Sequence, residues 1–162
     1  MATLWWGGPA AVASPPIDLG RLSSVAGCMG ENMLDHEELV AFVPVLDMDR
    51  ARAFYVGVLG LRLVDANPYA DVLDANGTTV RVTRVEAFTP HPFTSLGWSV
   101  ADMDATVAAL VAADVTFERF DGMDQDDRGV WTTPGGDQVA WFKDPDGNLL
   151  SLTQLTNGAD DG

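Results

Sequence analysis

The sequence VLDMD at residues 45–49 returns as VADMD at residues 100–104. Each copy ends an apolar run and opens a segment with the apolar spacing of a helix. Asp47 and Asp102 stand where a helix N-cap is favoured, because an Asp carboxylate accepts hydrogen bonds from the first free backbone N–H groups. The repeat therefore predicts two copies of a strand–cap–helix unit, and it decides the fold more than any single motif does.

The two copies also close alike. The turn sequence DANG at residues 74–77 corresponds to DPDG at residues 144–147, and an apolar strand follows each. Asn-Gly and Asp-Gly pairs supply the positive φ angles of tight hairpin turns. The second copy is 15 residues longer, and most of the extra residues fall at 121–136, where we expect a loop.

Between opening and closing, each copy has room for two further strands, so each reads as β-α-β-β-β. We expect strands at 39–45, 62–65, 69–74, 79–84, 96–100, 116–120, 138–143 and 149–154, and helices at 48–58 and 103–113. The domain boundaries that follow are a flexible N-terminal tail at 1–35, a first module at 36–88, a linker at 89–94, a second module at 95–156 and a C-terminal tail at 157–162. Translation that begins at Met33 would leave the first tail without a function.

Composition restricts the class of partner. The 162 residues are 47% apolar, and 24 acidic against 9 basic residues give a formal charge of −15. This charge repels phosphate backbones and anionic lipids, so nucleic acid and membrane are not expected partners; the same acidity suits a high-salt habitat or cationic ligands. No apolar stretch is long enough for a membrane span, and the single Cys28 cannot form an internal disulfide, so we expect a cytoplasmic protein.

Three further segments resemble the signatures of one known superfamily. The segments AFY at 53–55 and VLGL at 58–61 follow the first repeat, and FKDPDGNLLSL at 142–152 closes the second. With the β-α-β-β-β repeat, they resemble the vicinal oxygen chelate superfamily of glyoxalases, bleomycin-resistance proteins and extradiol dioxygenases over residues 38–155. The resemblance implies an α+β fold in which two tandem modules form a curved mixed sheet around one pocket, a homodimer, and four side chains that chelate a divalent metal.

The four places of those metal ligands can be counted from the signatures. They carry Val40, Arg81, Ser95 and Ser151. A catalytic metal of this kind needs His nitrogens or carboxylate oxygens, so we expect no metal and no other cofactor. His36 and His91 are interpreted as solvated loop histidines, and the acidic residues at 121–127 as a solvated loop without the spacing of a calcium loop.

Strand alternation predicts which side chains face the pocket. The candidate ligand-binding residues on this parity are Val40, Phe42, Arg81, Ser95, Gly97 and Ser151. Trp131 and Trp141 are added as aromatic walls, with packing in the core as the alternative for each. The strand residues that alternate with the pocket-facing ones are apolar throughout, as expected for a face that packs on a helix. Arg81 needs an anion, either an internal carboxylate, which is the favoured interpretation, or an acidic group of the ligand.

These residues predict a metal-independent protein that binds a small organic molecule of aromatic character, resembling bleomycin-resistance-type binding proteins. The alternative is a glyoxalase- or dioxygenase-like enzyme that acts on a small organic substrate, or a metal-free lyase or isomerase. No His, Cys or carboxylate pair on the predicted inner face supports acid–base catalysis, so whether the chain is an enzyme stays open.

Overall fold

The computed structural model describes residue 34 and residues 36–156, so the predicted tails lie outside this part apart from Leu34. All helices and strands belong to one unit that begins at Glu38. Among the described residues, no helix is long and apolar enough to cross a membrane. The elements in chain order are β1 (Val40–Val45), α2 (Met48–Arg52), η1 (Ala53–Val58), β2 (Arg62–Ala66), β3 (Ala70–Ala75), β4 (Thr78–Arg84), β5 (Leu96–Ser99), α3 (Met103–Ala112), β6 (Val130–Thr132), β7 (Gln138–Lys143) and β8 (Leu149–Gln154).

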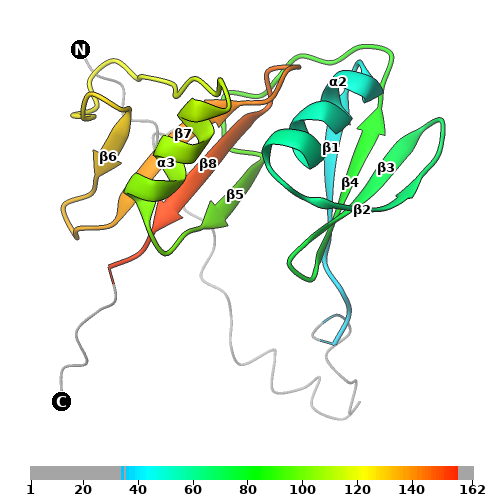
Figure 1. The fold of residues 1–162 in the computed structure, drawn as a ribbon, viewed down its shortest axis with the longest axis horizontal. Helices are drawn as coiled ribbons and strands as arrows, with labels where there is room; N and C mark the ends of the chain where they lie inside the picture. Colours follow the sequence, from blue (N-terminus) through cyan, green and yellow to red (C-terminus); the bar gives the residue numbers. More distant parts are fainter. Residues whose placement is uncertain (1–33, 35, 157–162) are drawn as a thin grey trace, which may run out of the picture. The chain divides into compact units, whose positions relative to one another are not determined.

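The strands form two mixed four-stranded sheets with the same topology. Their orders are β1-β4-β3-β2 in the first module and β5-β8-β7-β6 in the second (Figure 1). The first strand of each module pairs in parallel with the last, and the other neighbours are antiparallel. The predicted α+β class with two β-α-β-β-β modules is confirmed.

Both helices begin at the predicted Asp caps. Asp47 Oδ1 accepts hydrogen bonds from Asp49 N (2.9 Å) and Arg50 N (3.1 Å), and Asp102 Oδ1 accepts one from Ala105 N (2.9 Å). The helix expected at 48–58 is only partly α-helical, because η1 continues it as a π-helix. One more residue fits into the last turn, where Leu59 N donates to Phe54 O, and Gly60 then ends the segment with a φ of 73°.

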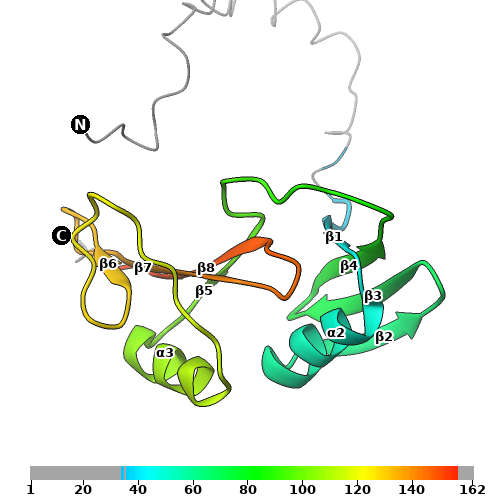
Figure 2. The ribbon, with the colours of Figure 1, turned by 90° about the horizontal axis from the view of Figure 1, so that it is seen from above.

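In each module the helix covers one face of the sheet, and the core lies between them (Figure 2). The strand residues of the predicted core parity, Val43, Val45, Val80, Val82, Leu150 and Leu152, are buried. Ala51, Phe54 and Tyr55 cover the first sheet, and Met103, Val107 and Leu110 cover the second. The strand residues that alternate with these buried ones point to the face of each sheet that the helix does not cover. The candidate pocket residues were expected on that face.

The strand expected at 116–120 is wrong. Phe117 makes only an isolated bridge to Phe142, and β6 lies instead inside the stretch that was expected to be a loop. β6 pairs with the first half of β7, with Val130 opposite Ala140. Residues near Phe117 take the second half, where Glu118 N donates to Trp141 O (2.7 Å). One edge of β7 therefore pairs with two separate segments, and each segment covers only part of that edge.

Candidate ligand-binding site

A pocket of about 390 Å³ lies where the end of β1, the linker between the modules and the strand ends of the second module come together. Its walls combine three phenylalanine rings with a few polar side chains. The lining residues are Phe42, Pro44, Phe88, Thr89, His91, Phe93, Ser95, Asn148 and Leu149. Its size and its mainly apolar lining are those of a small-molecule site.

Two of the aromatic walls are open to solvent. Phe42 is 65% exposed, because its parity on β1 is opposite to that of the buried Val43. Phe93 is 57% exposed and stacks on the His91 ring, with centroids 5.1 Å apart and planes at 17°. Large exposed aromatic side chains next to a pocket provide apolar area that a ligand can cover.

One wall of the pocket includes Asn148, which belongs to the turn at residues 144–148, called the joint turn below. Asp144 is 5% exposed and acts as the acceptor at its centre. Its Oδ1 accepts from Asp146 N (3.0 Å) and Asn148 N (2.8 Å), and its Oδ2 accepts from Asn148 Nδ2 (2.7 Å) and Tyr55 OH (2.8 Å). Gly147 supplies the positive φ of 91° that the turn requires. The DPDG sequence forms a hairpin turn, as predicted.

The joint turn also binds the first module. Asn148 Nδ2 donates to Pro44 O (2.8 Å), and Leu46 N donates to Asp146 Oδ2 (3.1 Å). A third hydrogen bond runs from Arg50 Nη2 to Pro145 O (2.8 Å). Because Pro44 and Asn148 also line the pocket, these bonds hold its two sides together.

Tyr55 is the buried partner of the joint turn. It is fully buried, and its ring packs edge-on against Phe54 with centroids 5.3 Å apart. Burial, followed by the neighbouring charge of Asp144, raises the pKa of the Tyr55 hydroxyl well above its ordinary value. The hydroxyl therefore stays protonated and donates to the carboxylate.

The predicted site residues of the first module lie on the open face of its sheet. Phe42 stands opposite Arg81 in the parallel pairing of β1 with β4, and Val40 precedes Phe42 by two residues on the same face. Phe42 lines the pocket, but Val40 and Arg81 do not. Within the described part of the chain, no carboxylate forms an ion pair with Arg81, so the internal salt bridge favoured by the sequence is not found there.

The predicted residues of the second module gather on the open face of the other sheet. Ser151 stands opposite Gly97 on one side and Trp141 on the other. An added Cβ at Gly97 would approach Ser151 Oγ to 2.7 Å, so a side chain at this position would require the Ser151 hydroxyl to move. Trp131 stacks on Trp141 with centroids 6.3 Å apart. Of the predicted set, only Phe42 and Ser95 line the pocket.

Sequence reasoning missed the part of the pocket that the linker provides. The sequence FTPHPF at 88–93 supplies Phe88, Thr89, His91 and Phe93, although the linker was expected only to connect the modules and His91 to be a solvated loop residue. His91 is exposed, but it stacks on an aromatic wall. Three aromatic rings within six residues of a linker were a signal that could have identified this wall.

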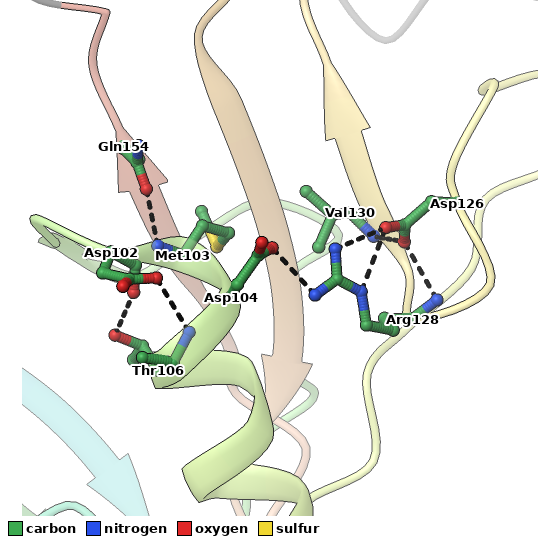
Figure 3. Close-up of polar contacts among 9 residues, drawn as sticks. Asp102, Met103, Asp104, Thr106, Asp126, Arg128, Val130 and Gln154 are labelled. Carbon is green, nitrogen blue, oxygen red and sulfur yellow. Dashed lines mark hydrogen bonds and ion pairs between the residues drawn. The ribbon is translucent and has the colours of Figure 1, made fainter.

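Among the acidic residues at 121–127, Asp126 has a structural role. Asp126 Oδ1 accepts from Arg128 N and Val130 N (both 2.9 Å), and Arg128 bridges Asp126 to Asp104 on α3 (Figure 3). Partial burial acts to raise the pKa of Asp126, but the hydrogen bonds from Val130 and Arg128 outweigh it and lower that pKa below its ordinary value. Between residues 36 and 156 there is no group of three His, Cys, Asp or Glu side chains that could hold a metal ion.

A second pocket, of about 490 Å³, lies beside the start of α2. Its charged lining includes Asp47, which caps α2, and Arg52, which forms a two-bond pair with the buried Asp71 (2.7 and 2.8 Å). Because this pocket is mainly polar and two of its charged groups already have partners within the fold, we assign the ligand site to the more apolar aromatic pocket.

Comparison with known proteins agrees with the architecture. The sequence model of the glyoxalase/bleomycin resistance protein/dioxygenase superfamily matches residues 34–152. A member of this superfamily from Sphaerobacter thermophilus is 26% identical, with a TM-score of 0.58 and coverage of 73% of this chain and 96% of that one. A protein of this superfamily from Alicyclobacillus acidocaldarius is 19% identical, with a TM-score of 0.56 and coverage of 75% of this chain and 93% of that one. A lactoylglutathione lyase from Agrobacterium tumefaciens is also 19% identical, with a TM-score of 0.56 and coverage of 72% of this chain and 91% of that one. No curated protein matches. The chain belongs to the glyoxalase/bleomycin resistance protein/dioxygenase superfamily.

Proposed function

We propose that this protein binds a small aromatic molecule in the pocket beside the joint turn and does so without a metal. The observation that carries the proposal is the pocket itself, about 390 Å³ with three phenylalanine rings in its walls. Covering the exposed faces of Phe42 and Phe93 with a planar ligand removes apolar area from water at roughly 25 cal/mol per Å². Apolar burial is the main source of affinity in such a site.

The four positions that correspond to the family's metal ligands do not suit a divalent cation. Val40 has no donor atom, and the guanidinium of Arg81 is itself a cation. Ser95 Oγ already donates its proton to Leu149 O (3.0 Å), and a neutral serine hydroxyl such as that of Ser151 is a poor substitute for a carboxylate. These residue types support binding that depends on aromatic contacts.

The alternative is a glyoxalase- or dioxygenase-like enzyme, the class to which the similar lactoylglutathione lyase belongs by its name. In the pocket, His91 is the one lining residue with a side chain suited to general acid–base catalysis near neutral pH. It stands on the linker without an acidic partner among the lining residues. We therefore favour binding over turnover.

The test combines metal analysis with a matched pair of variants. Protein purified without chelators is expected to contain no stoichiometric zinc, nickel, iron or manganese. Titration with indole, followed by NMR, should shift the signals of residues 88–93. Phe42→Ala should weaken indole binding by roughly tenfold, since about half of a Phe side chain would be buried by the ligand.

Tyr69→Ala is the control, because Tyr69 is also highly exposed (76%) but does not line the pocket. It should leave the dissociation constant unchanged. One bound metal ion per chain, lost together with indole binding on chelation, would overturn the proposal in favour of the enzyme. Indole shifts confined to residues outside the pocket, or no shift at all, would also overturn it.

A further inference from the structure

Asn148 is a buried amide whose position is completely determined. It is 5% exposed, and both N–H groups of Nδ2 are used, one by Pro44 O (2.8 Å) and the other by Asp144 Oδ2 (2.7 Å). Its backbone N donates to Asp144 Oδ1 (2.8 Å). The side chain therefore cannot rotate without breaking the joint turn.

The chemistry of these neighbours also fixes which end of the amide is which. Both partners of Nδ2 are acceptor oxygens, one carbonyl and one carboxylate. An inverted amide would place its own oxygen against these two, with no proton between them. The oxygen Oδ1 therefore points away from Pro44 and Asp144.

Oδ1 accepts no hydrogen bond within the described part of the chain. Every described side-chain N or O atom that is sealed from solvent has a partner, so this unpartnered oxygen is not sealed. Asn148 lines the pocket, and the rest of the residue is almost entirely buried. Because the pocket is the open space that Asn148 lines, we place Oδ1 in the pocket wall, as an acceptor that the two bonds of Nδ2 hold in position.

Ser95 provides a second acceptor in the same pocket. Its hydroxyl donates to Leu149 O (3.0 Å), which leaves only the lone pairs of Oγ for a ligand. No Lys or Arg is among the lining residues, and Arg81 stands outside the pocket. The two polar groups that the fold holds in place, Asn148 Oδ1 and Ser95 Oγ, are therefore neutral and available only as hydrogen-bond acceptors.

We propose that the pocket selects neutral aromatic ligands that carry an N–H or O–H donor on the ring, with Asn148 Oδ1 as the specificity-determining acceptor and Ser95 Oγ as the second. This inference rests on the proposed function and identifies its ligand class. A ligand without a donor would cover Oδ1 and leave it dry, which costs binding free energy. An anion would meet two oxygen acceptors on a chain whose formal charge is −15.

The experiment compares three probes that share one ring system: indole, 1-methylindole and indole-3-carboxylate. Indole presents an N–H donor, 1-methylindole has none, and the carboxylate adds an anion. We expect 1-methylindole to bind about fivefold more weakly than indole, and indole-3-carboxylate to bind more weakly than indole. Indole should shift the side-chain carbonyl ¹³C signal of Asn148, and 1-methylindole should leave that signal nearly unchanged.

A pair of variants tests the second acceptor. Because indole has a single N–H, the second acceptor is tested with 5-hydroxyindole, which adds an O–H donor. Ser95→Ala should weaken 5-hydroxyindole more than indole, whereas Ser99→Ala, an exposed change on β5 outside the pocket, should weaken neither. Equal binding of indole and 1-methylindole, with shifts at residues 88–93 from both, would overturn this inference and leave the proposed function standing. Preferred binding of the carboxylate would also overturn it. Failure of all three probes to shift the pocket signals would overturn the proposed function itself.

Discussion

At the scale of single residues, Asp144 is unusual because its buried carboxylate is stabilised without a cation. Four donors surround it, three of them from the joint turn and one from the Tyr55 hydroxyl. Between residues 36 and 156, no Lys or Arg forms an ion pair with it. Hydrogen bonds therefore supply the compensation for burying its charge, and each donor that is lost leaves the charge less well solvated.

Replacing Tyr55 by Phe tests this arrangement. Tyr55→Phe keeps the ring in the core and removes one donor, so unfolding in urea should show a loss of about 2 kcal/mol, within the range for hydrogen bonds to charged groups. The chain has only two tyrosines, which makes Tyr69→Phe a matched control. Tyr69 is 76% exposed, and its variant should unfold like the parent. Equal stability of the two variants would show that Asp144 is satisfied by the joint turn alone.

The sequence predicted some residue roles and not others for a physical reason. Caps such as Asp47 depend on a few neighbouring residues, so they could be predicted locally. The role of Asn148 depends on Pro44, which lies far away in the chain, and no local pattern contains that contact. Arg81 was expected to find a carboxylate, but its cross-strand neighbours are Phe42 and Val72.

At the scale of elements, the insertion at 121–136 is a folded loop that carries β6 and is called the hook below. Gln125 closes it, because its Oε1 accepts from Phe120 N (2.7 Å) and its Nε2 donates to Glu118 O (3.0 Å) and Gly129 O (2.8 Å). The Asp126–Arg128–Asp104 ion pairs then fasten the hook to α3. A strand of three residues is too short for an alternation pattern, so β6 could not be predicted from the sequence.

The hook should respond to pH through Asp126. Because the pKa of Asp126 is lowered in the folded state, its charge stabilises the fold above the ordinary value of 3.8, and this contribution is lost as the pH falls below that value. Asp126→Asn should lower the melting temperature at pH 7, and the difference from the parent should shrink towards pH 3. The effect should amount to about 1 kcal/mol or less, since the pair is partly exposed and screened.

Asp127→Asn is the control for this experiment, because it removes the same charge from a neighbouring, exposed position. Its melting temperature should follow that of the parent across the pH range. A deficit for Asp126→Asn that is the same at pH 7 and pH 3 would contradict the electrostatic account and assign the effect to hydrogen-bond geometry.

The other departure at this scale is the π-helix η1. Apolar periodicity predicted one continuous helix from Met48, and the predicted end at Gly60 is confirmed by its positive φ. The wider last turn still buries Phe54 and Tyr55 against the sheet. Periodicity could not reveal it, because η1 has only six residues, too few to distinguish the period of a π-helix from that of an α-helix.

At the scale of the whole molecule, the repeat was sufficient to predict the two modules and seven of the eight strands, since each copy carried its own cap, core parity and closing turn. The placement of the pocket was harder to predict, because it depends on the linker and on tertiary hydrogen bonds of the joint turn. Two of the eight predicted residues, Phe42 and Ser95, line it. Alternation identifies the open face correctly but does not say which part of that face is enclosed.

A homodimer, implied by the family resemblance, stays a prediction at this scale. Sedimentation equilibrium should then give about twice the chain mass of 17.3 kDa. A physical reason is that Leu39 (74%), Val40 (42%) and Val64 (55%) expose apolar area on the first module outside the pocket, which a second copy would cover. A mass of one chain throughout an accessible concentration range would show that the expectation is wrong.

The two closing turns of the repeat differ in how far the chain can be altered there. Asn76 and Gly77 are exposed at the tip of the first hairpin, with φ angles of 54° and 90° that suit a free-standing turn. Its counterpart in the second copy is the joint turn, whose atoms are bonded to β1 and α2. New termini, a tag or an inserted peptide are therefore tolerable between Asn76 and Gly77, whereas a cut between Asp146 and Gly147 would disrupt the turn that bonds to the first module and supplies Asn148 to the pocket wall.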